Sequence, residues 1–109
     1  MEKEFLESDW KKFRKQIAVW QERYMEQLCN EYIELLQSDQ KASEKFWALE
    51  KRIFKDKKHP GVIWEVSRSN VMPITLRLLR DHVIEMDELE EFSDCFKETV
   101  QCYLGNRRW

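Results

Sequence analysis

The residue types that support metal or acid–base chemistry are few and scattered in this chain. His59 and His82 are the only histidines, and neither has further ligands nearby in the sequence. A structural zinc site needs four Cys or His ligands at characteristic spacings, and no such spacing occurs. We therefore expect two ordinary surface or helix-end histidines, no bound metal, no cofactor and no catalytic site.

The three cysteines, Cys29, Cys95 and Cys102, form no Cys-x-x-Cys pair. Cys95 and Cys102 fall on one expected helix, about 10 Å apart along its axis at the usual rise per residue. A disulfide requires Cα atoms within roughly 7 Å of each other, so these two cannot be joined there. Each cysteine lies near an apolar stripe, where a reduced thiol acts as a small hydrophobic group. Reduced cysteines are typical of the cytoplasm, where we expect the protein to work.

An acidic cluster follows the second histidine: Asp87, Glu88, Glu90, Glu91 and Asp94. Carboxylates in such a cluster can bind cations or transfer protons. They also stabilise the start of a helix by opposing its dipole, which is the interpretation we favour. The cluster argues against a DNA-binding helix-turn-helix at this place, because phosphates must be neutralised by basic residues.

A basic run lies near the N-terminus, interleaved with two aromatic residues: Lys11, Lys12, Arg14 and Lys15. It occupies the first turns of an expected helix, where positive charge is unfavourable. Two interpretations stay open. The run forms a solvated helix face, which we favour, or it contacts the phosphates of a nucleic acid.

Composition predicts which elements must position these residues. The 109 residues include only two glycines and two prolines, whereas 42% are hydrophobic and 13% aromatic. Turn-poor chains of this kind favour helices over sheets. Charged residues make up 37%, yet the net charge is only -2, which is typical of solvated helix faces and indicates no particular partner. No apolar run reaches the roughly 20 residues that cross a membrane, and no apolar signal core is evident at the N-terminus.

Hydrophobic periodicity predicts an all-α fold, a four-helix and mostly antiparallel bundle with a long first helix. We expect a single domain over 1–109, with 106–109 as a loose tail. The helices should span about 9–37, 44–58, 70–82 and 86–104, and the conformation of 59–69 is left open. The residues expected in the core are Leu28, Tyr32, Phe46, Ile53, Leu78, Leu79, Leu89, Phe92 and Phe96.

The first half of the long helix carries a seam with coiled-coil spacing: Trp10, Phe13, Ile17 and Trp20. The helix is expected to outrun its neighbours, which would leave this seam in water and favour a homodimer through helix one. The alternative is a kink that folds the seam onto the second expected helix, 44–58. Trp64 is off any regular stripe and is either an interface or a core residue.

Two segments, 67–72 (SRSNVM) and 87–94 (DELEEFSD), resemble a group of small, uncharacterised, all-helical bacterial proteins. Some of those proteins carry the label multidrug transporter. The resemblance implies no activity, and the label conflicts with the lack of a membrane-spanning segment.

These patterns favour a non-enzymatic protein–protein interaction or regulatory module, with the protein itself as a possible partner. The alternative is a nucleic-acid-associated accessory protein that uses the basic run. No membrane partner is expected.

Overall fold

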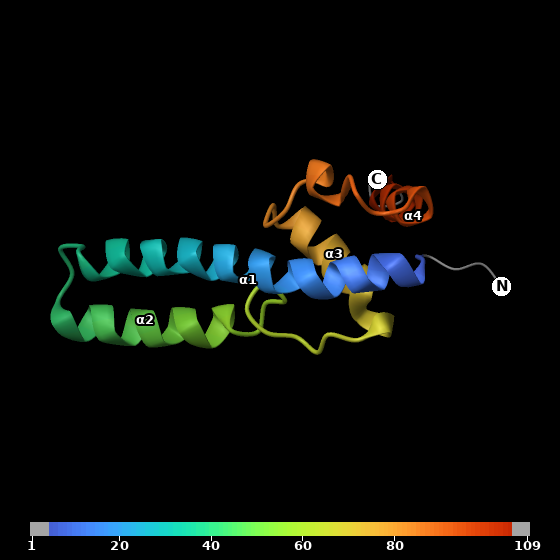
Figure 1. Cartoon of the computed structure of the whole chain (residues 1–109). Helices are drawn as coiled ribbons and strands as arrows, with labels where there is room; N and C mark the ends of the chain where they lie inside the picture. The colour runs from blue at the N-terminus through green and yellow to red at the C-terminus, as the bar shows by residue number, and fades with distance from the viewer. Residues whose placement is uncertain (1–4, 106–109) are drawn as a thin grey trace. The chain divides into compact units, whose positions relative to one another are not determined.

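The computed structural model describes residues 5–105, and in this part of the chain all regular structure is helical (Figure 1). The all-α fold class is therefore confirmed. The expected loose tail at 106–109 lies outside the described residues. The elements are α1 (Glu7–Leu36), α2 (Ala42–Asp56), the 3₁₀ helix η1 (Arg68–Asn70), α3 (Val71–Arg80), the 3₁₀ helix η2 (Met86–Leu89) and α4 (Asp94–Gly105).

The chain divides into two compact units that share α1. Unit 1 combines the chain up to Trp20 with the chain from Glu65 onward, and unit 2 is the segment Gln21–Trp64. We expected a single domain over 1–109, and the sequence did not indicate this division. The mostly antiparallel four-helix arrangement is not confirmed.

The core of unit 1 is built around α3, whose buried residues include Val71, Met72, Ile74, Leu78 and Leu79. Leu89, Phe92 and Phe96 are also buried, as the sequence predicted. The Phe92 and Phe96 rings stack with centroids 4.8 Å apart. Pro73 is the third residue of α3, where its missing N–H costs no hydrogen bond.

The seam on the first half of α1 also belongs to this core. Trp10, Phe13, Ile17 and Trp20 are all buried, and the Phe13 and Trp20 rings meet edge to face at 6.1 Å. The expectation that this seam is left in water is therefore wrong. The chain from Glu65 onward covers it in unit 1, and not the second helix, which was the alternative that we considered.

The starts of α1 and α4 are joined by the buried carboxylate of Asp9. It accepts hydrogen bonds from the Leu6 amide (2.8 Å), the Ser93 amide (2.7 Å) and the Ser93 hydroxyl (2.6 Å). The Ser93 oxygen in turn accepts the Phe96 amide, so Ser93 caps α4. This capping is why the helix expected over 86–104 is instead η2 followed by α4, which begins only at Asp94. Asp9 itself lies in the first turn of α1, which begins at Glu7.

α3 ends in a left-handed residue that is not glycine. His82 has φ 59°, and the Val83 amide donates back to the Leu78 carbonyl at 2.8 Å. The His82 amide donates to the Leu79 carbonyl at 3.2 Å. Together these bonds form a Schellman motif, which satisfies carbonyls at the helix end and turns the chain.

Unit 2 is a helical hairpin made from the second half of α1 and from α2 (Figure 1). Its open end is closed by the Pro60 turn, whose carbonyl accepts the Gln21 side-chain amide at 2.9 Å. Gly61 is required there, because a Cβ atom would lie 2.5 Å from the Tyr24 ring.

The contact face of the hairpin is narrow. Leu28 is buried and Tyr32 half-buried, but Phe46 and Ile53 are exposed, so the prediction that these two are core residues is wrong. Arg52 and Asp56 of α2 instead bond to residues of α1, and Leu49 is half-buried.

Candidate functional site

No arrangement typical of a metal centre occurs among residues 5–105: no three His, Cys, Asp or Glu side chains are grouped to hold an ion. All three cysteines lie in this range, and none forms a disulfide. His82 lies near Glu85, with 3.5 Å between Nδ1 and the carboxylate, but both side chains are exposed. In the described range, none of the helices combines the length and the apolar character needed to cross a membrane.

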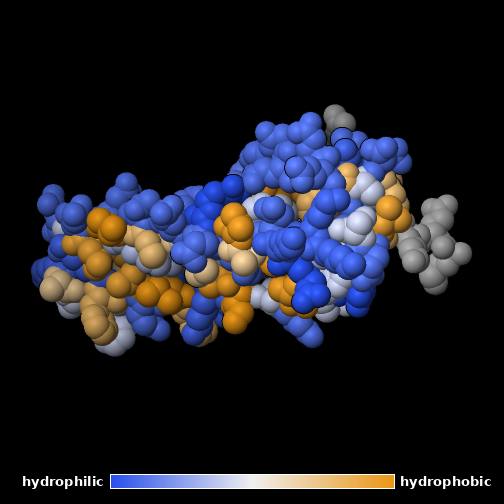
Figure 2. Space-filling view, in the orientation of Figure 1, coloured by the Kyte–Doolittle hydropathy of each residue, from blue (hydrophilic) through white to orange (hydrophobic). Residues whose placement is uncertain are grey.

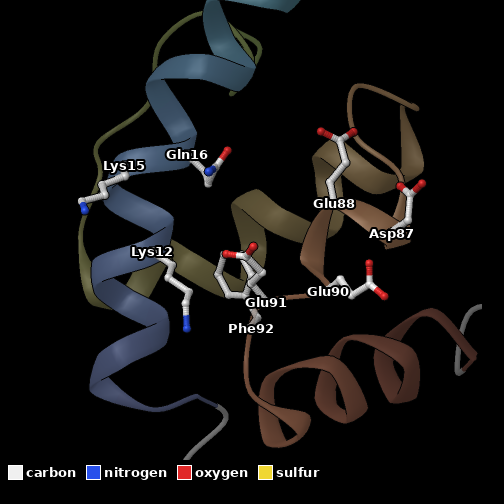
Figure 3. A pocket seen from close by; sticks show the side chains of 8 residues that line it. All are labelled: Lys12, Lys15, Gln16, Asp87, Glu88, Glu90, Glu91 and Phe92. Atoms are coloured by element: carbon white, nitrogen blue, oxygen red, sulfur yellow. The ribbon is translucent and has the colours of Figure 1, made fainter.

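Unit 1 contains an open pocket of about 500 Å³ between the start of α1 and the segment around η2. It is lined by Lys12, Lys15, Gln16, Asp87, Glu88, Glu90, Glu91 and Phe92. The acidic cluster and part of the basic run therefore meet here, which the sequence did not predict. Figure 3 shows that the charged groups do not converge, because Lys15 points away from the carboxylates. The pocket offers no set of groups aimed at one reacting atom.

The four residues of the basic run have different surroundings. Lys12 and Lys15 share the pocket with four carboxylate side chains, and the Arg14 guanidinium lies over the Trp10 ring at 5.6 Å. Lys11 is exposed on α1. Nearby carboxylates oppose the approach of phosphates, so this surface is less suited to nucleic acid than the run suggested on its own.

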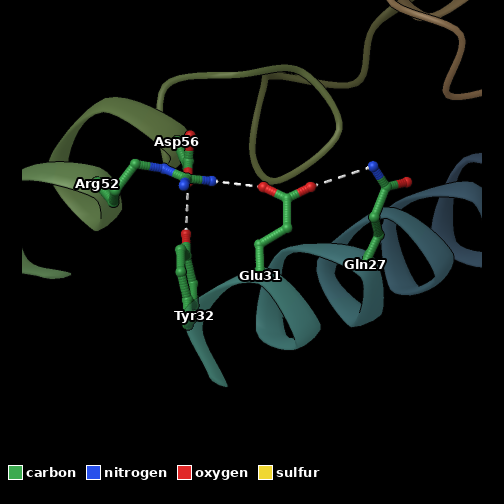
Figure 4. A network of polar contacts seen from close by, with 5 residues as sticks. All are labelled: Gln27, Glu31, Tyr32, Arg52 and Asp56. Carbon is green, nitrogen blue, oxygen red and sulfur yellow. Dashed lines mark hydrogen bonds and ion pairs between the residues drawn. The ribbon is translucent and has the colours of Figure 1, made fainter. Parts of the chain in front are cut away.

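A polar network fastens the two helices of unit 2 together (Figure 4). The Arg52 guanidinium donates to Glu31 at 2.7 Å and to Asp56 at 3.3 Å. The Tyr32 hydroxyl donates to the same Asp56 carboxylate at 2.7 Å, and the Gln27 amide donates to Glu31 at 3.3 Å. These bonds fix how α1 and α2 pair.

The network also raises the pKa values of two of its residues. Burial raises the pKa of Tyr32 to about 12, together with the hydrogen bond to the Asp56 carboxylate. The hydrogen bond to Glu31 raises the pKa of Arg52 above its ordinary value. These contacts hold both side chains in the protonated form, which suits a structural role. A proton donor at neutral pH would need a pKa close to that pH.

The outer face of the hairpin carries many exposed apolar side chains that take no part in the polar network. Figure 2 shows hydrophobic side chains gathered over both helices of unit 2 on the face in view. Phe46 and Trp47 are 63% and 64% exposed. The Phe46 and Trp47 rings contact each other edge to face at 5.0 Å. Exposed large hydrophobic residues of this hairpin are Ile33, Leu36, Phe46, Trp47, Ile53, Phe54, Ile63 and Trp64.

This apolar face differs from the interface expected from sequence. Of the candidates Trp10, Phe13, Ile17, Trp20 and Trp64, only Trp64 is exposed. The signal for the observed face was present in α2, where Phe46 and Ile53 are seven residues apart, as are Trp47 and Phe54. Such spacing places each pair on one side of a helix, but periodicity alone does not tell a core stripe from an exposed one.

No family model, curated protein or solved structure matches this chain, so the geometry of the site is the basis for a functional proposal.

Proposed function

We propose that this protein acts by binding another protein through the outer face of the unit 2 hairpin, and not by catalysis. The observation that carries the proposal is the exposure of Phe46 and Trp47 together with Ile53 and Phe54 on α2. Exposed apolar patches of this kind mark interaction surfaces, and Trp is enriched among the residues that dominate binding energy.

Two features of the hairpin support this proposal. The polar network of Arg52 holds α1 and α2 in a fixed pairing, which presents the apolar side chains on a preformed surface. Lysines surround the exposed Phe54 ring, with Lys58 Nζ at 4.1 Å and Lys57 Nζ at 5.4 Å from its centroid. An apolar centre with a charged rim is the usual composition of a protein interface.

Site-specific photocrosslinking tests the proposal. A photoreactive phenylalanine derivative at position 46 should give a discrete crosslinked protein in native cell extract. The matched control carries the same group at Gln101, which is exposed on α4 in unit 1. We expect no crosslink from the control. Replacing Phe54 with Glu in the position 46 protein should lower the yield at least about tenfold, because it puts a charge into the apolar contact.

Equal crosslinking from positions 46 and 101, or none from either, would contradict a specific interface on this face. Circular dichroism of each protein checks that α-helix content is unchanged.

A further inference from the structure

We infer that the partner of the hairpin is a second copy of this chain, and that two hairpins pair into an intermolecular four-helix bundle. In this bundle the second half of α1 lies beside α2 of the partner. The inference rests on the proposed function and adds the identity and orientation of the partner.

The second half of α1 presents its own apolar strip beside the one on α2. Met25, Cys29, Ile33 and Leu36 follow one another at steps of four, four and three residues, which keeps them on one side of the helix. Met25 is half-buried, and the other three side chains are exposed. The strip on α2 is Phe46, Trp47, Ile53 and Phe54, within an arc of about 120° at roughly 100° per residue.

A hairpin has only one layer of helices, so it cannot cover the apolar side chains that face away from the α1–α2 contact. A second layer of two helices can, and the result is a four-helix bundle. Each copy would offer the same surface, which is the requirement for a two-fold interface. A two-fold axis along the bundle places α2 of the partner over α1 and makes these neighbours antiparallel.

Charge identifies the partner as a copy of this chain. From Gln21 to Leu36, four glutamates accompany one arginine. From Lys41 to Lys58, seven basic residues accompany three acidic ones. The two helices of one hairpin are thus oppositely charged, and a two-fold partner brings the acidic helix of each copy to the basic helix of the other.

The charged residues at the outer edges of the two strips fit this pairing. Glu26 borders the α1 strip on the side away from α2, at about 100° around the helix from Met25, and Glu22 lies about one turn before Met25, at about 60°. Lys51 and Lys58 border the α2 strip on the side away from α1, and both are exposed. The Arg52–Glu31 ion pair already joins a basic α2 to an acidic α1 within one hairpin. The same pairing across copies would join Glu22 and Glu26 to the partner's lysines.

Charge reversal tests the partner and its orientation together. The variants are Glu22→Lys with Glu26→Lys, and Lys51→Glu with Lys58→Glu. Each variant alone places like charges across both copies of the α1–α2 contact. We expect the wild type to sediment as a dimer and each variant to dimerise at least about tenfold more weakly, since like charges across an interface are unfavourable.

Mixing the two variants is the decisive measurement. In a mixed dimer, one contact keeps the wild-type charges and the other has both sets reversed, so every pair is again opposite in sign. We expect the mixture to recover a heterodimer with a dissociation constant near that of the wild type.

Control reversals lie outside both apolar strips. Glu34 is nine residues from Met25, which is about 180° around α1, and Lys11, Glu65 and Arg80 are exposed residues of unit 1. Glu34→Lys with Glu65→Lys, and Arg80→Glu with Lys11→Glu, match the charge changes of the test variants. We expect both control proteins to dimerise as the wild type does, with helix content checked by circular dichroism.

The outcomes distinguish self-association from the proposed function. A wild type that stays monomeric, while position 46 crosslinks to a different protein, overturns self-association and leaves the proposed function standing. No crosslink at all overturns both. Folded variants that fail to recover a heterodimer on mixing, or controls that are weakened equally, overturn the α1–α2 pairing.

Discussion

Burial of a carboxylate is tolerated at Asp9 because its oxygens accept three hydrogen bonds, two of them from Ser93. A buried charge without such partners would be strongly unfavourable. The Ser93 hydroxyl donates to Asp9 and accepts the Phe96 amide, so one side chain positions the beginnings of two helices.

Replacing Asp9 with Ala should therefore lower the free energy of unfolding by about 3 kcal/mol, because it leaves buried amide and hydroxyl donors without acceptors. Urea denaturation followed by circular dichroism measures the change. Ser8→Ala is the matched control, since Ser8 is exposed on the same turn of α1, and it should change stability by less than about 0.5 kcal/mol. An Asp9→Ala protein as stable as the control would show that these bonds contribute little.

His82 at the end of α3 has a left-handed backbone conformation, which is unfavourable for a residue with a Cβ atom. Replacing it with Gly should raise the free energy of unfolding by about 0.5–1 kcal/mol. The urea midpoint reports the gain. His82→Ala keeps the Cβ atom and should give no such gain, so equal stability of the Gly and Ala proteins would argue against backbone strain as the cause.

Between the two helices of unit 2, the Tyr32–Asp56 hydrogen bond makes the stability of the α1–α2 contact sensitive to alkaline pH. The folded state raises the pKa of Tyr32 from 10.0 to about 12, so it favours the protonated phenol. Its stabilising effect is complete below pH 10, falls as pH rises towards 12, and is lost above that value.

Tyr32→Phe should lower stability by about 1 kcal/mol at neutral pH, because the hydrogen bond is lost and the ring is kept. The difference between wild type and variant should shrink between pH 10 and pH 12. Urea unfolding across this range gives the difference directly, and subtraction removes the contribution of other titrating groups. A difference that is constant over pH 8–12 would contradict a role for the phenol proton.

The predicted helix boundaries were nearly correct where local sequence signals set them. They were wrong where a contact with a residue far away in the sequence sets the boundary. α1 and α2 each begin two residues before their expected starts, within the uncertainty of a fraying helix end. The expected fourth helix was interrupted because Ser93 bonds to Asp9, 84 residues earlier in the chain. Ser93 is a favourable N-cap residue, which is a local signal, but its bonds to Asp9 are visible in no local pattern.

At the scale of the whole molecule, the sequence predicted the apolar stripes but not which of them would be covered. The stripe with Trp10 and Phe13 and the stripe with Phe46 and Ile53 have similar residue types and spacing. Burial of the first and exposure of the second depend on where the segment after Trp64 returns, which is a tertiary property. The exposed apolar surface was therefore expected on the wrong half of α1, although the long first helix itself was correctly predicted.

The division of the chain has a consequence for the order of folding during synthesis. Unit 2 is one uninterrupted segment, Gln21–Trp64, and its contacts form as soon as that segment leaves the ribosome. Unit 1 is discontinuous, and Asp9 does not meet Ser93 until most of the chain has been made. During that interval the Trp10–Trp20 seam has nothing to cover it, so the nascent chain exposes more apolar surface than the finished protein does. Slowing translation after Trp64 would lengthen that exposure and should increase aggregation or chaperone binding of the nascent chain.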